Sequence, residues 1–119
     1  MTTMIDILKI IIDAKTGYSI STFPTEPEAP AYILYPPDRL DRDQGMRIMS
    51  WPLIIKATSL VLLEASIALF EKMDTNYPGD GYEKNTATYP QAIYSKLVYM
   101  QWNADEFIAQ FQLDVRWNI

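Results

Sequence analysis

A strict alternation of apolar and polar residues between residues 106 and 117 constrains the fold more than any other feature of this sequence. The apolar residues are Phe107, Ala109, Phe111, Leu113, Val115 and Trp117, and the intervening residues are polar except for Ile108. Side chains alternate between the two faces of a β-strand, so this pattern predicts a long strand with one buried face. An average strand has only about five or six residues. We therefore expect another subunit to help cover this strand, and its polar face to border solvent or a lumen.

The segment SKLVYMQW, residues 95–102, is the expected partner of this strand in a β-hairpin. The residues between the two segments, Asn103, Ala104 and Asp105, are few and of the types that form tight turns. The sequence therefore predicts a long C-terminal hairpin, of which SKLVYMQW covers one part of the final strand.

Residues 3–17 have helical periodicity. Apolar side chains recur at the spacing of one helix face: Met4, Ile7, Leu8, Ile11 and Ala14. Thr3 is suited to be the N-cap, with Asp6 completing a weak capping box, and Gly17 is suited to end the helix.

A second helix is predicted over residues 59–73, with Ser59 as its N-cap. Glu64, Glu71 and Lys72 share one face of the helical wheel, yet Leu60 and Val61 lie on that same polar side. A helix that is apolar nearly all round is buried on more than one side. Either the long segment 18–45 or another subunit would supply the second cover.

The segment between these helices combines prolines with β-formers. Pro24, Pro27 and Pro30 recur at the three-residue period of polyproline II, and we interpret residues 21–30 as a stiff surface connector rather than a recognition peptide, which usually has a basic flank. A short strand is predicted over residues 31–35. Residues 38–45 are predicted to be a mixed-charge, solvated turn.

Residues 46–57 are rich in β-formers, but Pro52 lacks an N–H and requires a sheet edge or a bulge. Residues 74–90 form a loop by composition. Together these elements predict one domain, residues 1–119, of the α+β class. It has a mainly antiparallel sheet, two helices packed on it and a long C-terminal β-hairpin.

The composition disfavours several functions. The net charge is −5, and the ten Lys and Arg residues are scattered, so sequence-independent binding to nucleic acid is disfavoured. The chain has no Cys and no His, which removes the thiolate nucleophile and the commonest metal ligand. The acidic loop around residue 74 fails the calcium-loop pattern at Pro78 and Asn85. We therefore expect no enzyme activity, no metal and no cofactor.

No membrane or targeting segment is expected. The most apolar stretch, residues 52–70, contains Lys56 and Glu64, and each would cost about 2.5–3.5 kcal/mol at the centre of a bilayer. The first apolar run lacks the features of a leader sequence.

Tyrosines recur at intervals of five to seven from residue 77 to residue 99. Tyrosine and tryptophan are enriched in protein–protein interfaces, although these rings serve a domain's own core equally well. The candidate interface residues are Leu60, Val61, Tyr77, Tyr82, Tyr89, Trp102 and Trp117.

In its order of elements, the chain resembles the tail terminator, or tail completion, proteins of tailed bacteriophages. An N-terminal helix (IDILKIIIDAKTG) leads through a proline-containing segment to a short strand (FPTEPEAPAYILY). A second strand runs into the main helix (GMRIMSWPLIIKATSLVLLEASIALFEKM), and the final hairpin follows (SKLVYMQW and FIAQFQLDVRW). The likeness covers nearly the whole chain as order, length and pattern.

The resemblance implies a virion structural protein that forms a hexameric ring at the head-proximal end of the tail. This ring would join the tail tube to the head connector and let DNA pass through its lumen without catalysis. Its place would be the tail or neck of the virion and, before assembly, the cytoplasm of the bacterial host. It would have no membrane partner, and no individual residue is assigned a role.

A second hypothesis is a small acidic phage-encoded inhibitor that occupies a basic site on a host defence or nucleic-acid enzyme. Such an inhibitor would gather its carboxylates in one exposed ridge, whereas in this sequence they are dispersed among both signs of charge.

Overall fold

The computed structural model describes residues 3–43, 46–73, 75–76, 90–103 and 105–118. Within these residues the chain has two α-helices, one 3₁₀ helix and seven strands. In chain order they are α1 (Met4–Thr16), β1 (Ser21–Thr22), β2 (Ala31–Leu34), β3 (Arg39–Asp43), β4 (Met46–Ala57), α2 (Leu60–Phe70), η1 (Glu71–Met73), β5 (Thr75–Asn76), β6 (Pro90–Trp102) and β7 (Phe107–Asn118).

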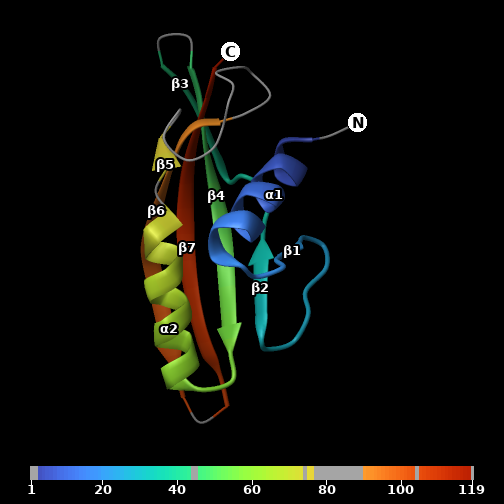
Figure 1. Ribbon diagram of the computed structural model, residues 1–119, viewed down its shortest axis with the longest axis vertical. Helices are drawn as coiled ribbons and strands as arrows, with labels where there is room; N and C mark the ends of the chain where they lie inside the picture. Colours follow the sequence, from blue (N-terminus) through green and yellow to red (C-terminus); the bar gives the residue numbers. More distant parts are fainter. Residues whose placement is uncertain (1–2, 44–45, 74, 77–89, 104, 119) are drawn as a thin grey trace.

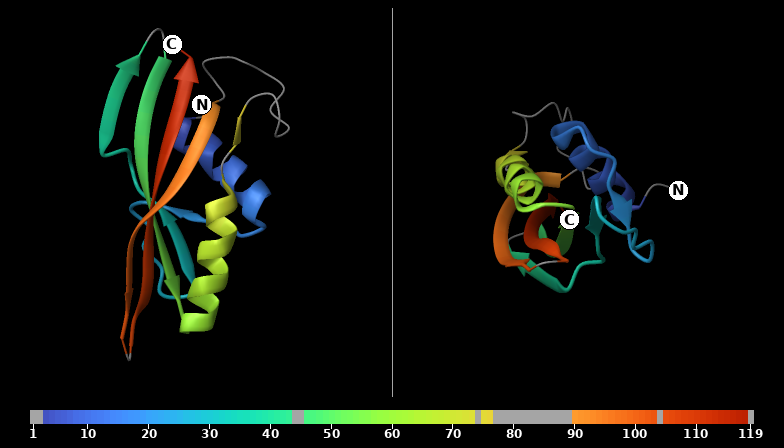
Figure 2. Two further views of the ribbon diagram at one scale, coloured as in Figure 1. Left: turned by 90° about the vertical axis from the view of Figure 1, so that its left-hand side faces the viewer. Right: turned by 90° about the horizontal axis from the view of Figure 1, so that it is seen from below.

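The strands form one sheet in the order β1-β2-β4-β7-β6-β5, and β3 pairs with the upper part of β4 (Figure 1). Every pairing is antiparallel except the short parallel pair β1–β2. Both helices pack on the same face of this twisted sheet (Figure 2). The predicted α+β fold, with a mainly antiparallel sheet, two helices and a long C-terminal hairpin, is confirmed.

The hairpin turn between β6 and β7 is closed by Asn103. Its backbone N–H donates to the carbonyl oxygen of Glu106 at 3.0 Å. Its side-chain oxygen accepts hydrogen bonds from the backbone N–H groups of Asp105 and Glu106, both at 2.9 Å. An Asn side chain that binds backbone donors two and three residues later stabilises a tight turn, as the sequence indicated.

Strand β7 lies in the centre of the sheet and pairs with β4 along its whole length and with β6 on its other side. Its alternate residues Ala109, Phe111, Leu113, Val115 and Trp117 are fully buried. The ring of Phe70 in α2 contacts that of Phe111, which places this buried face under the helices. The prediction that another subunit is needed to cover the final strand is therefore wrong, because the chain covers the strand itself.

Helix α1 has the predicted caps. The side-chain oxygen of Thr3 accepts the N–H of Asp6 at 3.3 Å, and the Asp6 carboxylate accepts the N–H of Thr3 at 3.2 Å. Gly17 ends the helix with a φ of 77°, a left-handed conformation that suits glycine. These contacts hold Ile7, Leu8, Ile11 and Ile12 against the core.

Helix α2 begins as predicted, with the Ser59 hydroxyl accepting the N–H of Leu62 at 3.2 Å. Its buried residues are Leu63, Ser66, Ile67 and Phe70, so only one face is covered. The segment that follows α1 packs beside this face, where the rings of Tyr18 and Tyr32 stack on each other and on Phe70. Segment 18–45 therefore does not supply the predicted second cover, and the opposite face of α2 remains exposed.

The predicted solvated turn at 38–45 is wrong, because residues 39–43 form strand β3. This strand pairs with β4 in a second hairpin, from Arg39 opposite Ser50 to Asp43 opposite Met46. Charged residues on an exposed edge strand discourage pairing with other chains, and a mixed-charge sequence at this position is therefore compatible with a strand.

Pro52 lies neither at a sheet edge nor at a bulge of its own strand, since β4 pairs continuously with β7. On its other side, β4 pairs with β3 from Met46 to Ser50 and with β2 from Leu53 to Lys56. Pro52 thus lies at the gap between two neighbouring strands. The two-residue strands β1 and β5 were not predicted. Of the predicted connector, residues 21–22 form strand β1, and residues 23–30 join β1 to β2.

Candidate functional site

The seven candidate interface residues lie in three different settings. Tyr77, Tyr82 and Tyr89 are outside the described residues. Trp117 is fully buried in the core of its own chain, with its ring centroid 6.1 Å from that of Trp51, and it contributes no exposed surface. Leu60, Val61 and Trp102 lie at one end of the molecule, where α2 begins and the β6–β7 hairpin turns (Figure 1).

The exposed face of α2 is apolar, and we name Val61, Leu62, Ala65 and Ala68 the α2 surface. The side chain of Val61 is 76% exposed and that of Leu62 is 51% exposed, and both alanines are exposed. Val61, Ala65 and Ala68 follow the spacing of one helix face. Leu60 is half-buried and packs against the core instead. Val61 was predicted from the sequence, whereas Leu62 was expected on the buried side.

The α2 surface is bordered by two carboxylates. Glu64 and Glu71 are both exposed, and they are seven residues apart, which places them along one flank of the helix. Lys72 is exposed at the far end of this flank, in η1. The apolar stripe therefore has an acidic border along most of its length.

A second exposed apolar area lies on the face of the sheet opposite the helices. Phe111 points toward the helices, and side chains alternate along a strand, so Gln110 and Gln112 point away from them. Their partners in β6, Tyr99 and Lys96, share this outer face. Val98 lies at a β-bulge between Leu97 and Tyr99. Lys96, Val98 and Tyr99 constitute the outer-sheet surface.

The apolar residues of the outer-sheet surface are open to solvent: Val98 is 47% exposed and Tyr99 is 49% exposed. The Tyr99 hydroxyl donates to the side-chain oxygen of Gln101 within the same strand. Further up the strand, the guanidinium carbon of Arg116 lies 5.8 Å from the centre of the Tyr94 ring. Tyr94 and Tyr99 belong to the tyrosine series seen in the sequence. The outward direction of Tyr99 depends on the bulge at Val98, which no sequence pattern revealed.

The upper part of the outer face carries a polar cluster. The Ser50 hydroxyl donates to Asp114 at 2.8 Å. The Gln112 amide nitrogen reaches the hydroxyl oxygen of Ser50 at 2.7 Å and a carboxylate oxygen of Asp38 at 2.9 Å. These bonds link β4, β7 and the residue that precedes β3, so the cluster serves to hold the strands together.

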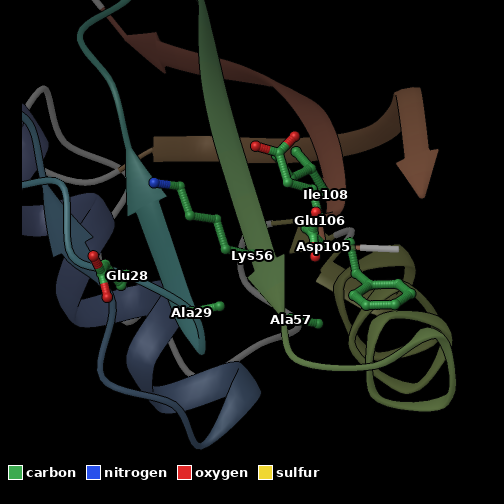
Figure 3. A pocket seen from close by; sticks show the side chains of 8 residues that line it. Glu28, Ala29, Lys56, Ala57, Asp105, Glu106 and Ile108 are labelled. Atoms are coloured by element: carbon green, nitrogen blue, oxygen red, sulfur yellow. The ribbon is translucent and has the colours of Figure 1, made fainter. Parts of the chain in front are cut away.

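A hollow of about 440 Å³ lies beside the hairpin turn. Figure 3 shows Glu28 and Ala29 on one side of it and Asp105, Glu106 and Ile108 on the other, with Lys56 between them. The Lys56 ammonium approaches the carbonyl oxygen of Pro27 at 3.4 Å, a long contact. The three carboxylates are exposed. Glu28 lies in the connector, whereas Asp105 and Glu106 lie in the hairpin turn. Among the residues that the structure describes, no group of three or more acidic residues is placed to hold a metal ion.

Two tyrosines next to the connector have perturbed pKa values. Burial raises the pKa of Tyr35 to about 12, and its hydrogen bond of 2.6 Å to the Glu26 carboxylate acts in the same direction. Burial also raises the pKa of Tyr32, whose hydroxyl lies 3.2 Å from that of Ser66. Both side chains fasten the chain between α1 and β3, with Phe23 tilted against Tyr35. Tyr35 therefore anchors the connector, and Tyr32 links β2 to α2.

No family model, curated protein or solved structure matches this chain significantly. In the described residues, no helix is long and apolar enough to cross a membrane. The α2 surface and the outer-sheet surface are the two features of this chain that indicate a function.

Proposed function

We propose that this protein is a structural subunit that assembles with copies of itself, and specifically a tail terminator of a tailed phage that forms a ring between tail tube and head connector. One observation carries the proposal: large apolar side chains are exposed on both faces of the molecule. Val61 and Leu62 lie on one face, and Val98 and Tyr99 lie on the other. Large contiguous apolar patches are rare on soluble monomers and mark sites of interaction with other molecules.

The order of elements supports the more specific part of the proposal. The resemblance rests on an N-terminal helix, a proline-containing connector and a short strand, followed by a strand that leads into the main helix and a final hairpin. The corresponding elements here are α1, residues 23–30, β2, β4, α2 and the pair β6–β7. The additional strands β1, β3 and β5 extend this arrangement without changing its order.

The charge of the protein is compatible with DNA passing through a ring. The net charge is −5, and the carboxylates of Glu28, Asp105 and Glu106 are gathered around the hairpin end. If this end lines the lumen, its negative charge keeps phosphates from binding tightly, since tight binding requires Lys and Arg. The protein would then act through its shape.

The second hypothesis, an acidic inhibitor, requires a continuous ridge of carboxylates. In the described part of the chain, acidic groups are instead distributed over α1, β3, α2 and the hairpin turn, and some are paired. Asp13 binds Lys9, and Asp41 binds Arg39 at 3.1 Å. This distribution favours the assembly proposal.

Negative-stain electron microscopy of the full chain, combined with size-exclusion chromatography and light scattering, tests this function. We expect closed rings of uniform diameter with a central hole. Only monomers at every protein concentration, or aggregates without a fixed number of copies, would contradict the proposal.

A further inference from the structure

We infer that neighbouring subunits meet face to back, with the α2 surface of one copy packed against the outer-sheet surface of the next copy. This inference rests on the proposed function and adds the identity of the two contacting surfaces. The partner at each surface is a second copy of this chain.

The two surfaces lie on opposite faces of one subunit. The α2 surface faces away from the sheet on the helix side, and the outer-sheet surface lies on the opposite side of the same sheet (Figure 2). A single subunit cannot bring the two together. Two different surfaces on one molecule generate a head-to-tail contact, which closes into a ring when the rotation between copies allows it.

The side chains of the two surfaces are complementary in size. On α2, the exposed alanines Ala65 and Ala68 leave a shallow strip beside Val61. The outer-sheet surface offers the larger side chains of Val98 and Tyr99. The two small side chains on α2 leave room for the bulky ones of the other surface, and tyrosine supplies a large contact area with a polar tip.

The two surfaces also differ in charge. The α2 surface is bordered by Glu64 and Glu71, with Lys72 only at its far end. The outer-sheet surface carries Lys96, with Asp114 and Arg116 further along the same face. Within the described residues, neither Glu64 nor Lys96 has an ion-pair partner. An acidic border that meets a basic residue fixes the register of a contact and disfavours the pairing of two identical surfaces, because like charges would then meet.

Pairing through sheet edges is less favourable than this face-to-back contact. The exposed edge of β6 is interrupted by the bulge at Val98. The exposed edge of β3 carries Arg39, Asp41 and Arg42. Bulges and charges are the features by which natural sheets prevent edge pairing.

Charge reversal across the contact tests the inference in the full chain. The single variants are Glu64→Lys and Lys96→Glu, and the double variant exchanges the two charges. Glu28→Lys is the matched control, because it makes the same change of charge on an exposed residue outside both surfaces. Circular dichroism and thermal melting establish that each variant is folded, and sedimentation velocity measures the oligomer as a function of concentration.

We expect each single reversal to raise the concentration at which half of the subunits are assembled by about tenfold or more. The double variant should recover most of this loss, and Glu28→Lys should assemble like the unchanged protein. An oligomer that is insensitive to both single reversals, or a double variant that is no better than the singles, would overturn the inference while leaving the proposed ring intact. A chain that never assembles would overturn both.

Discussion

The backbone N–H of Tyr35 donates to the carbonyl oxygen of Pro52 at 2.9 Å, and this bond explains how a proline lies inside an interior strand. The N and C=O groups of one strand residue point to the same side. The nitrogen of Pro52 therefore points toward β2 and β3 and away from β7. On that side, residues 35–38 connect β2 to β3. No hydrogen bond of the sheet therefore needs the N–H that Pro52 lacks.

Replacing Pro52 should consequently have only a small effect on the stability of the fold. We expect Pro52→Val to lower the free energy of unfolding by about 0.5–1 kcal/mol, chiefly because proline restricts the unfolded chain. The control is Met49→Pro, whose nitrogen points toward β7. This variant should lower the free energy of unfolding by about 1–3 kcal/mol or more, because it leaves a hydrogen-bond acceptor of β7 unpaired. Urea denaturation measures both values, and equal costs would contradict the assigned directions.

Trp117 and Trp102 should differ sharply in their contribution to stability. Trp117 is fully buried, so Trp117→Ala should cost about 3–5 kcal/mol through lost burial and a cavity. Trp102 is 55% exposed, and Trp102→Ala should change the stability by only about 0.5 kcal/mol. Chemical denaturation of the two variants compares them directly. A large cost for Trp102→Ala would mean that this ring is covered.

The raised pKa of Tyr35 predicts a loss of stability at high pH. The pKa in the folded state is about 12, against an ordinary value of 10.0. The fold therefore favours the neutral hydroxyl. The stability that Tyr35 contributes through this preference is complete below pH 10. It is lost as the pH rises from 10 toward 12.

Tyr35→Phe removes this titrating group and should remove that part of the pH dependence. Glu26→Gln should lower the pKa of Tyr35, since the carboxylate favours the neutral hydroxyl. The phenolate absorbance during a pH titration reports the pKa, and unfolding at several pH values reports the stability. Identical pH profiles for the unchanged protein and Tyr35→Phe would refute the assignment.

Gly17 should resist substitution for reasons of backbone conformation alone. A Cβ at this position would meet nothing within 4 Å, yet its φ of 77° is unfavourable for other residues. We expect Gly17→Ala to cost about 1–2 kcal/mol, whereas Gly17→Asn should cost less, because Asn tolerates the left-handed region. Thermal melting of both variants checks this order. An Ala variant as stable as the unchanged protein would contradict it.

Local signals in the sequence were sufficient for the helices and the final hairpin. Thr3, Ser59 and Gly17 mark helix ends because their side chains or φ preference act on the adjacent backbone, and Asn103 marks the turn in the same way. Local signals could not predict that β7 lies in the centre of the sheet. Its buried face depends on pairing with β4, a strand far away in sequence, and the strand therefore seemed to need another subunit.

The surfaces were only partly predictable for a similar reason. Val61 stands out because it is apolar on the charged side of a helical wheel. The outward direction of Tyr99 depends on the bulge near Val98, and the strand character of Arg39–Asp43 depends on a hairpin with β4. Neither feature leaves a pattern in local hydropathy.

The central claim is that this chain forms an assembly with a fixed number of copies. Native mass spectrometry of the full chain, over a range of protein concentrations, measures that number directly. The account predicts one discrete oligomer of at least three copies that dissociates on dilution into the monomer without other stable species. A monomer at every concentration, or a dimer alone, would contradict a ring built from the two surfaces.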